Sequence, residues 1–401
     1  MSQSTENLNY DLRPKLSLNS SRLTRRTYGF DEISLVPGSY TLDIELCDTT
    51  FNIDKLNFKI PILASAMDSV VNVKTAAILS KLGALPVLNL QGLQARYENP
   101  DNVLDQIAKC DDSRFIELFQ KLYAEPVQDK LIIKRIQELK EVNSIVAVSV
   151  TPNFAEKYLD LLIENKIDVL VVQSTVTGII HKSVLGSSSL NVAKLCKKAP
   201  FPVVVGNCVT YKTACDLMEA GVSAILVGIG PGAACTSRSV LGIGVPMATA
   251  IADCAQAKID YLAKTGRYVS VIADGGMISA GDICKAIACG ADATMIGSPL
   301  AKAKEAPGRG YHWGMATPSP ILPRGTRVKV GSISKLEEIL FGPATIDDGS
   351  QNLIGALQTS MATLGASNLA EMQNIDIVIA PSILKEGKLY QSAQSLGMGR
   401  T

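Results

Sequence analysis

Aromatic residues and histidines are scarce in this chain. Of its 401 residues only 5% are Phe, Trp or Tyr, and it has one tryptophan and two histidines, His181 and His312. The nine cysteines are scattered and contain no Cys-x-x-Cys pair, so we expect no structural zinc site. An odd number of unclustered cysteines also argues against a disulfide framework and fits a reducing cytoplasm.

No sign of charge dominates, and no long apolar run is present. The chain carries 39 basic and 38 acidic side chains, which gives no net field to attract nucleic acid or an anionic membrane. No apolar stretch reaches the roughly 18 residues that a membrane span requires. The polar first 21 residues lack the apolar segment of a signal peptide. We therefore expect a cytoplasmic protein whose partners are small molecules.

Small apolar residues are abundant instead, and they recur in short runs. Hydrophobic residues make up 47% of the chain, as is typical of parallel strands that are buried on both faces. Eight runs are strand candidates: 60–64, 85–88, 145–150, 169–172, 202–205, 224–227, 269–273 and 293–296. Helix-like stretches lie between most of them: 73–82, 154–162, 191–198, 212–220, 247–263 and 280–288.

This alternation predicts an α/β fold, a parallel (β/α)8 TIM barrel. The alternative is an open doubly wound sheet, which would want a glycine-rich dinucleotide turn after the first strand; residues 64–68 do not provide one. We divide the chain into a polar N-terminal arm, 1–29, and a single barrel domain, 30–401. Two intervals interrupt the domain. Residues 91–143 are expected to add helices at 103–109, 114–122 and 128–139, and the Gly-, Pro- and Thr-rich residues 306–352 a flap or finger over the pocket.

Cys235 follows the predicted sixth strand in a glycine-rich loop, residues 228–237. Loops at the carboxyl ends of barrel strands form the active site, so a thiol at this position is placed to act as a nucleophile. On these residues alone an alternative stays open, because cysteine is among the most commonly buried residues and the loop could be a simple turn.

Two further turns suggest an anion site. Asp274-Gly275-Gly276 ends the seventh strand and Gly297-Ser298 ends the eighth, where barrel enzymes bind phosphate through backbone N–H groups. Asp274 can accept two hydrogen bonds from a ribose diol. Glu305, after the eighth strand, is expected to lean back toward Ser237 and share a proton with it. The plain alternatives are an ordinary turn and a solvated helix face.

Together these motifs resemble the IMP dehydrogenase / GMP reductase family. The resemblance rests on the loop 228–237, the turn 274–276, the segment 297–308 and the opening 29–38, which occur in the family's order. It implies a purine nucleotide 5′-monophosphate substrate, a nicotinamide cofactor and a Cys235 that attacks purine C2 to form a thioimidate. It also implies a homo-tetramer or homo-octamer.

The resemblance also assigns residues around the thiol. Those implied to contact substrate are Ser65, Met67, Asp274, Gly275, Gly276, Gly297, Ser298, Met315 and Ala316. The cofactor is expected at Gln173, Ser174, Thr175 and Asn207, and a monovalent cation such as K+ at the carbonyls of Gly230, Gly232 and Cys235. The chain departs from the family's pattern at three positions. Ala233 replaces a phosphate-binding serine, Gln173 an acidic residue near the cofactor ribose, and Ser237 a catalytic threonine.

The two family reactions need different groups. Dehydrogenases carry an adjacent Arg-Tyr pair on the flap and an inserted regulatory (CBS) module, whereas here Arg324 and Arg327 have no adjacent tyrosine and 91–143 is too short for that module. Reductases use a hydroxyl and a glutamate, for which Ser237 and Glu305 are available. The sequence therefore favours NADPH-dependent reduction of GMP to IMP and ammonia. Alternatives are oxidation of IMP to XMP with NAD, in which His312 is a candidate base, an FMN-binding barrel, and a nucleotide-binding protein without turnover.

Overall fold

The structure, a computed structural model, describes residues 25–181, 190–314, 326–381 and 386–397. Eight parallel strands close into a barrel, which confirms the predicted (β/α)8 fold. In barrel order they are β4 (Ile62–Ala64), β5 (Leu85–Asn89), β6 (Ala147–Val150), β7 (Val169–Gln173), β10 (Val203–Cys208), β11 (Ala224–Val227), β12 (Ser270–Asp274) and β13 (Ala293–Ile296). Each overlaps one of the eight predicted runs.

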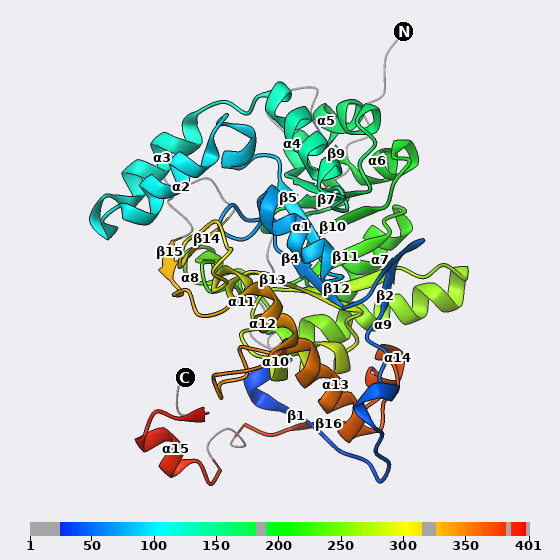
Figure 1. Cartoon of the computed structure of the whole chain (residues 1–401). Coiled ribbons are helices and arrows are strands. Elements are labelled where there is room, and N and C mark those ends of the chain that lie inside the picture. Colours follow the sequence, from blue (N-terminus) through cyan, green and yellow to red (C-terminus); the bar gives the residue numbers. More distant parts are fainter. Residues whose placement is uncertain (1–24, 182–189, 315–325, 382–385, 398–401) are drawn as a thin grey trace, which may run out of the picture.

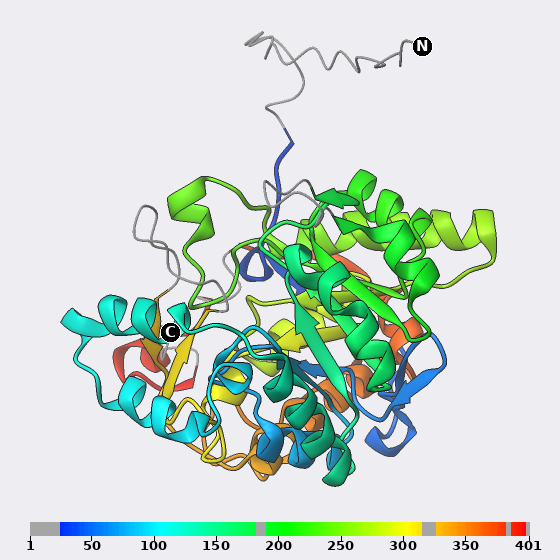
Figure 2. The same ribbon diagram turned by 90° about the horizontal axis from the view of Figure 1, so that it is seen from above.

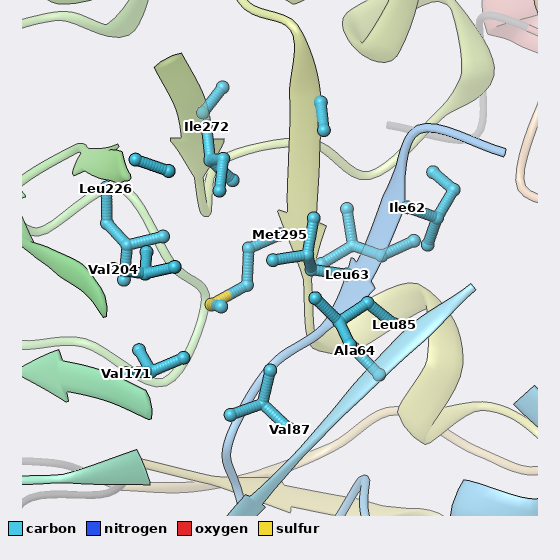
Figure 3. Close-up of a cluster of buried hydrophobic side chains, with 14 of the residues drawn as sticks. Ile62, Leu63, Ala64, Leu85, Val87, Val171, Val204, Leu226, Ile272 and Met295 are labelled. Atoms are coloured by element: carbon cyan, nitrogen blue, oxygen red, sulfur yellow. The ribbon is translucent and has the colours of Figure 1, made fainter. Parts of the chain in front are cut away.

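The barrel strands are apolar because both of their faces are buried. Side chains from these strands, among them Leu63, Val204 and Met295, gather in one buried cluster (Figure 3). The barrel closes where β13 pairs with β4, with Met295 opposite Leu63. Burial on both faces removes the polar alternation of a half-exposed strand, which is why continuous apolar runs identified the strands.

Helices surround the barrel (Figure 1). The six predicted between strands are present as α1 (Val73–Lys81), α5 (Pro152–Glu164), α6 (Val192–Lys198), α7 (Tyr211–Glu219), α9 (Met247–Thr265) and α10 (Ala280–Ala288). Local signals fix their ends: α1 begins with a capping box between Asn72 and Thr75, and α9 ends at Gly266 in the left-handed conformation. None of the helices in the described part of the chain is both long and apolar enough to cross a membrane.

The interval between β5 and β6 adds helices, as predicted. They are α2 (Pro100–Lys109), α3 (Phe115–Ala124) and α4 (Asp129–Glu141). Helix α4 packs on the barrel core, whereas α2 and α3 form a second hydrophobic cluster with a hairpin of β14 (Tyr311–Trp313) and β15 (Arg327–Lys329). The hairpin lies beside α2 and α3 in both views of the molecule (Figures 1 and 2).

Several short elements were not predicted. The strands are β1 (Ile33–Leu35) paired with β16 (Ile377–Ile379), β2 (Phe51–Ile53) with β3 (Leu56–Phe58), and β8 (Ile180–His181) with β9 (Leu190–Asn191). The helices are α8 (Ser237–Leu241), α11 (Ser298–Ala301), α12 (Leu336–Phe341), α13 (Leu353–Leu364), α14 (Leu369–Met372) and α15 (Leu389–Ala393). Helix α12 corrects part of the predicted flap, residues 306–352. Its apolar residues Leu336, Ile339 and Leu340 are buried, so this part of the interval belongs to the helical layer.

Candidate active site

A cavity of about 610 Å³ lies where the barrel strands end. Its walls come from the ends of β4, β6, β7, β10, β11, β12 and β13 and the segments that follow them, together with His312 of the hairpin. The carboxyl ends of the strands of a parallel barrel all meet on one face, which explains why residues far apart in sequence converge here. The volume lies in the range that holds nucleotide-sized ligands.

Cys235 lines this cavity and is exposed to it. Its Sγ donates a hydrogen bond to Ser237 Oγ at 3.4 Å, and Ser237 is buried as the first residue of α8. An accessible thiol with a hydroxyl acceptor beside it can attack an electrophilic carbon and pass its proton on.

The Asp-Gly-Gly turn packs directly against the thiol loop. Gly276 has a φ of +81°, and a Cβ on it would lie 2.9 Å from Pro231 Cβ. Gly228 is equally constrained, because a Cβ there would lie 2.3 Å from the carbonyl oxygen of Asp274. Both positions therefore need glycine. The structure thus brings the thiol and the predicted phosphate turn together at one end of the barrel.

Asp274 is held by two amides. Its Oδ2 accepts hydrogen bonds from Gln173 Nε2 at 2.8 Å and Asn207 Nδ2 at 2.7 Å. Burial raises the pKa of Asp274 to about 6, and the two amide donors act in the opposite direction. Gln173 Oε1 is buried with no hydrogen-bond partner among the described residues. This unsatisfied acceptor in the cavity wall suits the hydroxyl or amide donors of a nicotinamide nucleotide.

His312 faces the same cavity from the hairpin. It is only 3% exposed, and its Nδ1 lies 3.0 Å from Ser69 Oγ. A Cβ on Gly297 would lie 2.9 Å from His312 Cε1, so the ring sits against the second predicted phosphate turn. Burial lowers the pKa of His312 to about 4, so the imidazole is neutral near pH 7 and its Nε2 is left for a ligand. The sequence suggested His312 only as a candidate base.

Glu305 does not line the cavity. Its Oε2 accepts a hydrogen bond from the backbone N–H of Leu336, the first residue of α12, at 3.1 Å. The expected contact with Ser237 fails because α11 ends at Ala301 and the chain then turns to the segment before α12, with Lys304 N–H bonded to Ser334 O at 2.8 Å. The spacing of Glu305 from the eighth strand suggested a helix that continues toward the barrel mouth. The chain after Ala301 does not form this helix.

Most of the other predicted site residues meet in the cavity. Its walls include the substrate candidates Ser65, Met67, Asp274, Gly275, Gly276, Gly297 and Ser298, the cofactor candidates Gln173, Ser174, Thr175 and Asn207, and the cation candidates Gly230 and Gly232. Met315 and Ala316 lie outside the described residues. Their roles, like those of the lining residues, stay predictions.

The proposed cation ligands are backbone carbonyls rather than side chains. Gly232 O already accepts a hydrogen bond from Cys235 N–H at 2.9 Å, which leaves it one lone pair. Among the described residues, no group of three or more His, Cys, Asp or Glu could hold a metal ion. A monovalent cation on these carbonyls stays a prediction.

The chain is similar to known proteins in sequence and in structure. The model of the IMP dehydrogenase / GMP reductase domain matches residues 27–316. An uncharacterized oxidoreductase of Mycolicibacterium smegmatis is 37% identical over 91% of this chain and 99% of its own length. The inosine-5′-monophosphate dehydrogenase of Cryptosporidium parvum is 28% identical over 90% and 94%. A crystal structure of an IMP dehydrogenase/GMP reductase-like protein from Corynebacterium glutamicum superposes with a TM-score of 0.83 at 36% identity, covering 88% of this chain and 95% of that one.

The fold and the cavity define a barrel enzyme with an accessible thiol beside two glycine turns at the ends of β12 and β13. The chain belongs to the IMP dehydrogenase / GMP reductase family, as the resemblance predicted. It is therefore an oxidoreductase, and the family implies a nucleotide substrate and a nicotinamide nucleotide cofactor. Helices α2 to α4 fill the described interval between β5 and β6, where the sequence analysis expected no regulatory module.

Proposed function

We propose that this protein oxidises IMP to XMP, with NAD as the oxidant, through a covalent bond between Cys235 and purine C2. The observation that carries the proposal is the single cavity that contains the Cys235 thiol, the Asp274 carboxylate and the two glycine turns. An anion site and a nucleophile in one cavity suit a nucleotide whose base, rather than its phosphate, reacts. The relatives named as IMP dehydrogenases support this choice of reaction.

The residues divide into binding and reacting groups. Backbone N–H groups at Gly276 and at Gly297-Ser298 bind the phosphate, and Asp274 accepts the ribose hydroxyls. The Sγ of Cys235 bonds to C2 while the C2–N3 double bond opens, and Ser237 Oγ, 3.4 Å from Sγ, takes the thiol proton and releases its own hydroxyl proton to N3. A nicotinamide nucleotide held by Gln173, Ser174, Thr175 and Asn207 would supply the oxidant that takes the hydride from C2, and the N3 proton would leave as the C2–N3 double bond forms again. Water then adds to C2 of the thioimidate and the C–S bond breaks, which gives XMP and restores the thiol.

The position of Glu305 supports this direction over GMP reduction. A reductase needs a proton donor for the departing ammonia, and the predicted donor is bound to the start of α12 outside the cavity. The sequence analysis favoured reduction because it placed Glu305 beside Ser237. Glu305 and Ser237 are not paired in the structure, so GMP reduction lacks its predicted proton donor.

Reduction of GMP remains the second candidate, because it needs no base to activate water, whereas IMP oxidation does. Arg327 stacks on Tyr311, with the guanidinium carbon 4.3 Å from the ring centroid, but this Arg–Tyr pair faces away from the cavity and its guanidinium binds carbonyls of the α2–α3 region. Arg309 is paired with Asp101 and Asp105 and does not line the cavity either, so among the described residues no flap arginine is placed to act as a base for water. Arg324 lies outside them.

Two parallel assays test the proposal. Purified protein is incubated with IMP and NAD, and separately with GMP and NADPH, while the absorbance of the reduced nicotinamide is followed. We expect absorbance to rise with IMP, XMP to accumulate, and Cys235→Ala to abolish both. Loss of NADPH with GMP and no reaction with IMP would instead establish the reductase. Binding of nucleotide without either reaction would mean a protein without turnover, and a yellow preparation an FMN barrel.

Oligomerisation and the cation belong to the same proposal. We expect a tetramer or octamer by light scattering of the purified protein. We expect faster IMP oxidation in K+ than in Li+ at equal ionic strength, because the smaller ion fits carbonyl ligands set for K+ poorly.

A further inference from the structure

Strand β14 turns its side chains in two directions. Successive residues of a strand point to opposite faces, so His312 faces the cavity while Tyr311 and Trp313 face α2 and α3. Trp313 is fully buried in the α2–α3 cluster, and Tyr311 packs at its edge. The placement of His312 therefore depends on how residues 311 and 313 are held.

Trp313 is held through α3. Its indole Nε1 donates to Tyr123 OH at 3.1 Å, and Tyr123 OH donates to Asp68 Oδ2 at 2.6 Å. Asp68 lies in the loop after β4 and also accepts a hydrogen bond from the backbone N–H of Leu93 at 3.0 Å. This chain of buried hydrogen bonds connects the hairpin, the inserted helices and the barrel, and each buried polar group in it depends on the next.

Arg327 holds the other strand of the hairpin. It is paired with Trp313 in the register of β14 and β15, and its side chain is only 2% exposed. The guanidinium lies 4.9 Å from the ring centroid of Phe115 on α3 and donates to the carbonyl oxygens of Ile107 and Cys110 and to Asp112. A buried guanidinium with this many acceptors fixes the hairpin against the insertion.

We propose that α2 and α3 form a support that positions His312 against the nucleotide, and that Tyr123, Trp313 and Arg327 are positioning residues for substrate binding. His312 Nε2 lies beside the Gly297 turn, so the part of the ligand that it contacts is the phosphate end. The choice of IMP as the ligand rests on the proposed function, whereas the support itself does not. The inserted helices thus take part in the active site although none of their side chains lines the cavity among the described residues.

Two buried arginines provide a matched test. Arg135 on α4 also donates to backbone carbonyls, Gln94 O at 3.0 Å and Glu98 O at 2.9 Å, but it does not touch the hairpin. We expect Arg327→Lys to weaken IMP binding about tenfold, and Arg135→Lys to change it less than about twofold, at a similar loss of thermal stability. Calorimetric titration with IMP measures both. Equal effects of the two substitutions on binding would overturn the proposal.

A double-mutant cycle separates positioning from general stability. If Arg327 acts through His312, then Arg327→Lys weakens IMP binding much less in a His312→Asn background than in the wild-type protein. Additive effects of the two substitutions on the dissociation constant would show that Arg327 acts by another route and would reject the proposal.

The single tryptophan supplies a readout that needs no turnover. We expect IMP to change the emission of Trp313, and Tyr123→Phe to shift that emission and weaken IMP binding by several-fold. Tyr97→Phe is the control, since Tyr97 OH donates to Leu122 O in the same cluster and, among the described residues, bonds to neither Asp68 nor Trp313. A protein that binds IMP without oxidising it would refute the proposed function alone, whereas wild-type binding in Tyr123→Phe and Arg327→Lys would refute the support alone.

Discussion

We expect nucleotide binding to depend on pH through Asp274. Burial raises the pKa of this carboxyl from 3.8 to about 6 despite the hydrogen bonds from Gln173 and Asn207. The charged carboxylate accepts hydrogen bonds from both ribose hydroxyls more strongly than the protonated acid, which has less acceptor capacity and no charge. The Asp274 carboxylate is therefore charged above its pKa, and the affinity for IMP should fall as the pH drops through about 6.

The size of the effect follows from the same pKa. At pH 7 about one-tenth of Asp274 is protonated, and at pH 5 about nine-tenths is, so the dissociation constant of IMP should rise about tenfold between them. The 5′-phosphate titrates in the same range, so a reference protein is required. Asp274→Asn serves as this reference, because it removes the titration of the carboxyl and leaves that of the phosphate. It should itself bind IMP about 10- to 100-fold more weakly at pH 7, as expected for loss of a charged hydrogen-bond acceptor.

The assay is calorimetric titration with IMP at several pH values for the wild-type protein and two variants. Asp68→Asn is the second variant, because burial raises the pKa of Asp68 to about 6 as well. This carboxyl contacts Tyr123 and acts on the ligand only through the support, so the variant separates its titration from that of Asp274. We expect the excess pH dependence to disappear in Asp274→Asn and to persist in Asp68→Asn. The reverse pattern would refute the reasoning about Asp274.

Three further predictions concern the turn, the core and the direction of the reaction. Gly276→Ala should lower kcat/KM with IMP by at least about 100-fold, because its Cβ would meet the thiol loop, whereas Gly266→Ala, equally left-handed but with open space around it, should leave kcat/KM unchanged in steady-state assays. Lys258→Met should lower the free energy of unfolding in urea by about 3–5 kcal/mol, because it leaves the buried Asp292 carboxylate unpaired; the exposed Lys212→Met should cost less than about 0.5 kcal/mol. Glu305→Gln should leave IMP oxidation within about threefold of wild type, and a loss of about 100-fold or more would return Glu305 to the catalytic groups.

The sequence predicted the barrel well because its strands carry a strong local signal. Each parallel strand is buried on both faces and appears as a continuous apolar run. The pairings of β1 with β16 and of β14 with β15 have no such signal, since the strands have three residues each and their partners are fixed only by tertiary packing. Helix α12 was missed because glycine and proline nearby suggested a loop throughout 306–352.

The sequence likewise predicted some residues of the candidate site and missed others. Cys235, Asp274 and the glycine turns follow strands, so a correct barrel places them on one rim. Glu305 lies several residues past the last strand, where its direction depends on where α11 ends and on a contact with α12. The contact of His312 with Ser69 joins segments 243 residues apart and depends on the hairpin, which no local pattern announced.

The closure of the barrel determines when the chain can complete its fold during synthesis. Strand β4, at residues 62–64, completes its hydrogen bonds only when β13, at residues 293–296, has been synthesised, and β1 must wait for β16, at residues 377–379. Until then the nascent polypeptide carries an open sheet edge and an uncovered apolar interior, both of which favour aggregation. Truncation before residue 293 should therefore yield insoluble product.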